Sequence, residues 1–144
     1  MMKPSGFAML ALALVATTTS ASDLASLIDL PVAGSALVPA SKYHDALSRA
    51  AHTGSPVDIA LSVAGAFEGA RQVIVQTNEG AESASASRVI VIHDGLLDDA
   101  LRTKRWDISL ARTAADPWEI KEVRTAWRCW RGAKAPGFAA QPCP

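Results

Sequence analysis

The chain has 144 residues, of which 49% are hydrophobic and 19% are charged, with 14 basic and 14 acidic side chains. This length predicts one domain, and the apolar fraction excludes a chain that is disordered throughout. The balanced charge does not indicate a general polyanion-binding protein. The charge is unevenly spread, because residues 22–100 carry four basic and ten acidic side chains, whereas residues 101–144 carry nine basic and four acidic ones. The basic C-terminal part is therefore a local feature that needs an explanation.

The N-terminus has the order of regions that is typical of a secretory signal peptide. Lys3 supplies one positive charge before an unbroken apolar run of ten residues, and Thr19 and Ala21 are the small residues expected before the cleavage site. Ten apolar residues are too few to cross a bilayer core of about 30 Å as a helix. We therefore expect a signal peptide at residues 1–21 and a periplasmic or secreted mature protein without a stable membrane anchor. The alternative is a buried N-terminal helix.

Cys129 and Cys143 are the two cysteines of the chain. An oxidising compartment favours their pairing, and two cysteines allow one intramolecular connection. We expect a disulfide between them, and the short loop that it closes would stabilise the fold by about 3 kcal/mol. A free thiol and an intermolecular bridge are the alternatives.

The first part of the mature chain is predicted to be helical. The expected segments are a short helix at 22–30, a linker at 31–38, a helix at about 40–52 and a helix at 55–67. Ser41 is a candidate cap of the second helix, and Gly54 is suited to the position after its end. Ser55 and Pro56 suit the start of the third helix. The β-branched residues of this third segment also allow a strand.

After these helices the hydrophobic pattern changes to a two-residue alternation, which is typical of strands. The expected strands cover residues 71–77, 88–93, 105–111 and 118–131. In the last strand the alternation slips, so that Ile120 lies in one phase and Val123 in the other. A one-residue bulge near Lys121 and Glu122 would bring both apolar sets to the core.

Helices grouped before a run of strands predict an α+β fold. We expect N-terminal helices packed on a three- to four-stranded antiparallel meander sheet. The predicted organisation is a signal peptide at residues 1–21, a helix and linker at 22–39 and a single α+β domain at 40–144.

Acidic residues follow the second predicted strand. Asp94, Asp98 and Asp99 are candidate ligands of a hard cation, although their spacing does not match an EF-hand loop. The interpretation we favour is a turn, in which Asp94 and Gly95 bend the chain and Asp98 caps the next residues. His93 is not favoured as a general base beside Asp94, because adjacent strand residues point to opposite faces.

The sequence has no nucleophile elbow, phosphate-binding glycine loop or zinc-protease motif, so we assign no catalytic residue and no cofactor.

Arginine and tryptophan alternate near the C-terminus. On a strand, Arg128 and Trp130 would face one way, and with Arg131 they would form a cationic and aromatic surface suited to anionic ligands such as envelope polymers. A simpler interpretation has more weight from the sequence alone: Trp127 fills the core beside the disulfide, and the arginines lie over apolar surface.

Two segments carry a resemblance to a group of uncharacterised bacterial exported proteins and lipoproteins: IHDGLLDDAL at residues 92–101, and a tail with Trp127, Arg128, Cys129, Gly132, Phe138 and Cys143. Members of that group look like small domains with an Asp-Gly-Leu-x-Asp-Asp-Ser segment and a tail that ends in a final cysteine. Here Ala100 stands where serine is usual, and residues 132–134 replace a Gly-Arg-Gly turn. The resemblance implies export and a disulfide between Cys129 and Cys143, and it implies no activity.

The function that we expect is that of a non-catalytic envelope protein, which binds a protein partner or an anionic envelope polymer. No nucleic-acid partner is expected. The alternative is a small metal-assisted hydrolase that uses Asp94, Asp98 and Asp99. A structural subunit associated with lipid or cell wall is a third possibility.

Overall fold

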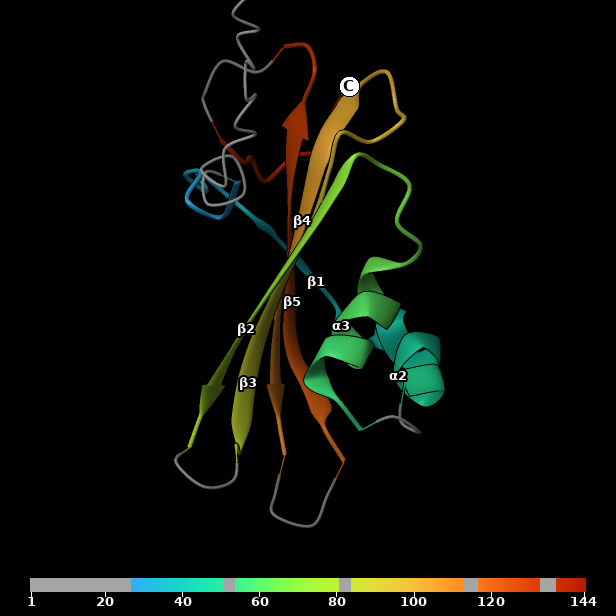
Figure 1. The fold of residues 1–144 in the computed structure, drawn as a ribbon, viewed down its shortest axis with the longest axis vertical. Helices are drawn as coiled ribbons and strands as arrows, with labels where there is room; N and C mark the ends of the chain where they lie inside the picture. Colours follow the sequence, from blue (N-terminus) through green and yellow to red (C-terminus); the bar gives the residue numbers. More distant parts are fainter. Residues whose placement is uncertain (1–26, 51–53, 81–83, 113–116, 133–136) are drawn as a thin grey trace, which may run out of the picture.

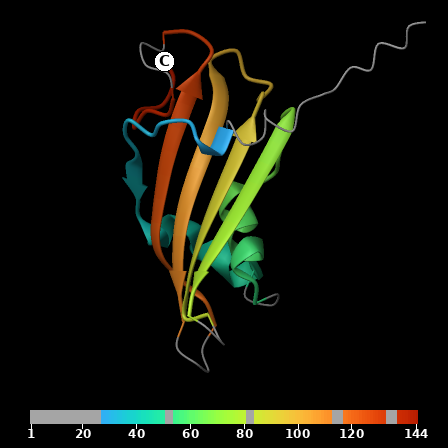
Figure 2. The same cartoon turned by 60° about the vertical axis from the view of Figure 1, so that its left-hand side comes forward.

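The computed structural model describes residues 27–50, 54–80, 84–112, 117–132 and 137–144. Within these residues, five strands form one antiparallel sheet in the order β1-β5-β4-β3-β2, and two helices cover one of its faces (Figures 1 and 2). The elements in chain order are β1 (Ala36–Val38), the 3-10 turn η1 (Ala40–Tyr43), α2 (His44–Ala50), α3 (Pro56–Ala64), β2 (Arg71–Glu79), β3 (Ala86–Asp94), β4 (Leu101–Ala111) and β5 (Glu119–Cys129).

This architecture corrects the predicted fold. A three- to four-stranded sheet preceded by all the helices is wrong, because β1 precedes α2 and α3 and adds a fifth strand. Strand β1 lies within the segment predicted as a linker, and it pairs with β5 from Ala36↔Thr125 to Val38↔Val123. Three residues are too few to show a two-residue alternation, and their partner lies near the other end of the chain. The predicted signal peptide, and most of the helix predicted at residues 22–30, lie outside the described residues.

Strands β2 to β5 form where alternating and β-branched residues predict them, and each pairs with the next along the chain. The predicted bulge in β5 is confirmed. Ser109 pairs with Glu122 and Leu110 with Ile120, which leaves Lys121 as the extra residue. The bulge resets the alternation, so that Ile120 and Val123 are both buried. A second register shift lies between the Leu101 and Thr103 pairs of β4.

The helix-covered face holds the larger core. Helix α3 begins at Pro56, directly after Ser55 as predicted, and it ends before Gly65, three residues short of the predicted end. The segment predicted as one helix at about 40–52 forms η1 followed by α2 up to Ala50. The core packs α3 residues on apolar residues of β3, β4 and β5: Ile59, Ala60, Val63, Val89, Val91, Trp106, Ile108, Leu110, Ile120 and Val123. No helix in the described part of the chain is long and apolar enough to span a membrane.

Among the described residues, the cover of the opposite face of the sheet lies at one end. There Ile92, Ala126 and Phe138 form a second core, against which Ile28 and Leu30 of the N-terminal segment pack. Figure 2 shows this segment crossing the front of the sheet, with the helices behind it. The C-terminal tail joins this end, because Phe138 and Ala139 form backbone bridges with Val32 and Trp127.

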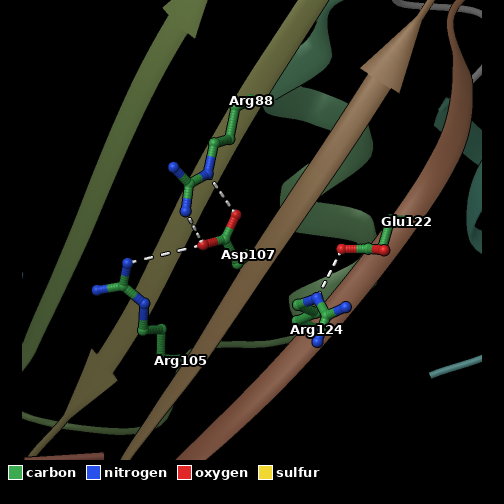
Figure 3. A network of polar contacts seen from close by, with 5 residues as sticks. All are labelled: Arg88, Arg105, Asp107, Glu122 and Arg124. Atoms are coloured by element: carbon green, nitrogen blue, oxygen red, sulfur yellow. Dashed lines mark hydrogen bonds and ion pairs between the residues drawn. The ribbon is translucent and has the colours of Figure 1, made fainter. Parts of the chain in front are cut away.

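Charged side chains occupy the middle of this second face (Figure 3). Arg88 of β3 donates from Nε to Asp107 Oδ1 at 2.7 Å and forms a second hydrogen bond to Oδ2. Arg105 Nη2 lies 3.7 Å from the same carboxylate, and Arg124 Nε donates to Glu122 Oε1 at 2.6 Å. Each positive charge in this network therefore lies beside a carboxylate, although Arg88 and Arg105 share one, and the Arg88 contact links β3 to β4 locally.

Candidate functional site

Four polar residues form one row across the face opposite the helices. Arg71 on β2 pairs with Asp94 on β3, Asp94 pairs with Thr103 on β4, and Thr103 pairs with Arg128 on β5. Cross-strand partners project to the same side of a sheet, so the register alone brings these side chains together. The row lies at the end of the sheet where β5 leads into the disulfide-bonded tail.

Asp94 is the anionic centre of this row, and its side chain is only 4% exposed. Thr103 Oγ1 donates a hydrogen bond to Asp94 Oδ1 at 2.6 Å, and Arg71 donates to Oδ2 from Nη2 at 2.7 Å and from Nε at 3.2 Å. Burial alone would raise the pKa of Asp94. The hydrogen bonds from Thr103 and Arg71, with the positive charge of Arg102, outweigh burial and hold this pKa below its ordinary value.

Three arginines lie near this carboxylate, and we call Arg71, Arg102 and Arg128 the arginine cluster. Arg102 Nε lies 4.0 Å from Asp94 Oδ1, and this buried nitrogen has no hydrogen-bond partner among the described residues. Partial burial and the nearby charge of Arg102 lower the pKa of Arg128, and the charge of Asp94 opposes this shift. Within the described residues, Arg102 and Arg128 therefore add positive charge beside a carboxylate that Arg71 already binds.

The binding residues predicted from the sequence lie beside this cluster. Arg128 is a member of it, and Trp130 packs its ring against Arg102, with the guanidinium carbon 4.9 Å from the ring centre. Trp130 is 48% exposed, so an aromatic face lies next to the cations. Arg131 is further out, with an 80% exposed side chain 3.9 Å from Asp99, which is 93% exposed, and such a solvent-exposed pair contributes little to stability.

A hollow of about 260 Å³ lies between the end of β5 and the C-terminal tail. Its lining includes Arg128, Arg131 and Phe138. The predicted disulfide is confirmed at this place: Cys129 and Cys143 are bonded, with their Cα atoms 5.6 Å apart. The bond holds the tail beside the last residues of β5, so it also fixes the position of the tail relative to Arg128.

Trp127 was expected to fill the core beside the disulfide. Its side chain is only partly buried.

Sequence reasoning missed Arg71 and Arg102 as members of this surface. Arg71 begins a strand 57 residues before Arg128, and only the register of the sheet brings the two into one row. Arg102 lies at the register shift of β4, between the pairs of Leu101 and Thr103. The excess of basic residues in 101–144 indicated a cationic surface in this part of the chain. It did not indicate which of these side chains would lie close together.

The three acidic residues proposed as metal ligands are not brought together. Asp94 is engaged by Thr103 and Arg71 in the row. Asp98 accepts hydrogen bonds from the backbone N–H groups of Ala100 and Leu101 at 2.8 and 2.7 Å, which is the capping role that the turn interpretation predicts. Among the described residues, no group of three histidine, cysteine, aspartate or glutamate side chains is arranged to hold a metal ion.

His93 lies on the other face of the sheet from Asp94. Its Nε2 atom is 2.9 Å from the Gln72 amide nitrogen, and its ring lies 5.0 Å from Phe67 and 4.8 Å from Trp106, centre to centre. Burial, with a smaller effect from the charge of Lys104, lowers the pKa of His93 and so favours the neutral ring. This environment is that of a core histidine, and it separates His93 from the carboxylate that follows it in the sequence.

Comparison with known proteins gives no match: no family model matches the chain, and no curated protein and no solved structure is significantly similar to it.

Proposed function

We propose that this chain is an exported, non-catalytic envelope protein that binds an anionic envelope polymer at the surface formed by the arginine cluster, Trp130 and Arg131. The observation that carries the proposal is that, within the described residues, two further guanidinium groups, those of Arg102 and Arg128, lie near the Asp94 carboxylate that Arg71 already binds. Arg71 and Thr103 already donate three hydrogen bonds to Asp94. The additional cations are suited to an external anion.

The chemistry of arginine favours this class of ligand. A guanidinium group presents five N–H donors in a planar fork, which matches the oxygens of phosphate and carboxylate groups. Within the described residues, Arg128 makes no hydrogen bond or ion pair, and the exposed ring of Trp130 lies beside Arg102. A repeating polymer can place one anion at the cluster and another at Arg131.

Export to the periplasm or the medium is part of the same proposal. The disulfide between Cys129 and Cys143 is consistent with an oxidising, extracytoplasmic compartment. The charge and apolar run of residues 1–21, and the resemblance to bacterial exported proteins, support cleavage after Ala21. Mass spectrometry of the native protein tests this: we expect an N-terminus at Ser22 and one intact disulfide, and a protein that retains Met1 with two reduced thiols would refute export.

Binding is tested with two polyanions, inorganic polyphosphate and polyglutamate, titrated against the oxidised protein while the fluorescence of tryptophan is recorded. The double variant Arg128→Gln/Arg131→Gln should bind about a hundredfold more weakly, because two charge-assisted contacts are lost and each loss weakens binding about tenfold. The affinity of the wild type should also fall as salt is added. The stronger of the two probes identifies phosphate or carboxylate as the preferred anion.

The matched control is Lys121→Gln, which removes an exposed positive charge from the bulge of β5, where Lys121 pairs with Glu119. This variant should bind both polymers as the wild type does. Equal weakening by the control would show general charge attraction, and unchanged binding by the double variant would show that the polymer binds elsewhere. Either result would refute the proposed site.

A further inference from the structure

Strand β2 forms one edge of the sheet, and no strand of the described residues pairs with its outer side (Figure 2). It is nine residues long, whereas the other edge strand, β1, has only three residues. An edge of this length presents a row of backbone N–H and C=O groups that another strand can pair with. Proteins commonly block such edges with proline, bulges or inward-pointing charges, and β2 (RQVIVQTNE) contains no proline and pairs with β3 without a register shift.

The sequence of β2 is complementary to itself when two copies run antiparallel. A register centred on Val75 places Arg71 opposite Glu79 of the second copy at both ends of the paired segment. The same register places Val73 opposite Thr77, and Val75 opposite Val75. All five residues belong to one alternating set, so each pair would project from the same face.

The electrostatics of the whole edge favour this direction of pairing. The Arg71 end of β2 belongs to the arginine cluster, and the Arg71 side chain, which binds Asp94, is 35% exposed. The other end carries the exposed side chain of Glu79. An antiparallel arrangement brings each positive end to a negative end, whereas a parallel arrangement would bring like charges together.

The apolar side chains of β2 also remain incompletely covered. Ile74 is 39% exposed, and it lies in the set that faces the helices because it pairs with Val91 of the main core. Val73 and Val75, on the opposite face, are half-buried. A second copy at the edge would cover part of all three side chains, and covered apolar surface contributes about 25 cal/mol per Å².

From these observations we propose that two copies of this chain form a symmetric dimer by antiparallel pairing of β2 with β2. The five described strands of each copy would then form one continuous sheet, and the two-fold axis, perpendicular to the sheet, would place the helices of both copies on the same side. The proposal does not depend on anion binding.

Cysteine cross-linking tests the register directly. At the axis, Val75 of one copy faces Val75 of the other at a Cα separation of about 4.5 to 5.5 Å, within the range that a disulfide requires. Val75→Cys in the protein produced from its full coding sequence should therefore give a covalent dimer under mild oxidation. The matched control is Val73→Cys, on the same strand and face, whose two copies would lie about 13 Å apart and should not cross-link.

The oligomeric state provides the second test. Light scattering of the wild type should give twice the mass of the mature chain, and Glu79→Arg should weaken the dimer about tenfold, because it replaces two attractive pairs by two repulsive ones. Glu68→Arg makes the same charge change outside β2 and should leave the dimer intact. A wild type that stays monomeric at high concentration, or Val73→Cys that cross-links as readily as Val75→Cys, would overturn the proposal. So would a monomer whose β2 edge is occupied by a different protein.

Discussion

Arg71 and Asp94 lie opposite each other on β2 and β3, and Arg71 Nη2 is 2.7 Å from Asp94 Oδ2 although 23 residues separate them in the chain. Together with Thr103, Arg71 compensates the burial of a carboxylate that would otherwise be costly to ionise. Asp94 in turn offsets part of the repulsion between Arg102 and Arg128. This carboxylate is therefore the structural centre of the surface to which we assign anion binding.

Replacing this carboxylate by an amide should destabilise the protein. Asp94→Asn removes the negative charge to which Arg71 donates two charge-assisted hydrogen bonds, and the arginine cluster loses this counter-charge. Hydrogen bonds to charged groups contribute about 1.5 to 3 kcal/mol, so we expect the free energy of unfolding to fall by about 2 kcal/mol. Urea unfolding measures this free energy, and Asp29→Asn, at an exposed position, is the control. Equal small losses for both variants would contradict a central role for Asp94.

The same variant should change the acid stability. The pKa of Asp94 lies below its ordinary value in the folded protein, so the unfolded chain binds a proton at this group more readily. The contribution of ionised Asp94 to the free energy of unfolding is present in full above the ordinary pKa of about 3.9. It is lost as the pH falls towards the lower pKa of the folded protein. The wild type should therefore lose stability below about pH 4 more steeply than Asp94→Asn. Parallel curves for the two proteins would show that other carboxyl groups dominate.

His93 should make stability depend on pH in a higher range. Its pKa is lowered by burial, with a contribution from Lys104, so below the ordinary value of about 6.5 the unfolded chain binds more protons than the folded one. Stability should then decrease as the pH falls below about 6.5 and level off below the folded pKa. Thermal unfolding between pH 8 and 5 measures this slope, which His93→Gln should flatten. The exposed His44→Gln on α2 is the matched control, and equal flattening in both variants would contradict the assignment.

Removing the disulfide should destabilise the tail and the sheet end that it joins. Cys129 and Cys143 are 14 residues apart, and a loop of this size is expected to contribute about 3 kcal/mol by restricting the unfolded chain. The double variant Cys129→Ser/Cys143→Ser should lose about this much in urea unfolding, and reductant should then have no further effect on it. If reduction left the unfolding midpoint of the wild type unchanged, the stabilising role would be refuted.

The bulge of β5 leads to a prediction about deletions. Because Lys121 is the unpaired residue between the pairs of Ile120 and Glu122, deleting it leaves a regular ladder with the same residues buried. We expect a loss of about 1 kcal/mol or less. Deleting Arg124 instead would move one side of β5 out of phase with its partners and should prevent stable folding. Circular dichroism and urea unfolding compare the two deletion variants. An equal loss of stability in both would show that the bulge itself is required.

Much of the sheet could be predicted from local pattern. The alternation of β2 to β5 appears directly in the sequence, and the phase slip around Lys121 predicted the bulge because one buried face must be kept along the strand. The start of α3 at Pro56 was also predictable, since proline has no N–H to lose at the first helical position. In each case neighbouring residues carry the information.

The arginine cluster and β1 were not predictable in this way. Arg71, Arg102 and Arg128 lie on three different strands, and their proximity depends on the register of three hairpins. Strand β1 is too short to have a pattern, and its partner β5 lies near the opposite end of the chain. The amino-acid pattern thus specified which segments become strands and which sides of them are apolar, because burial acts on neighbouring side chains. Only the assembled sheet determined which cations meet at Asp94 and which edge stays unpaired, because both depend on contacts between residues far apart in the chain.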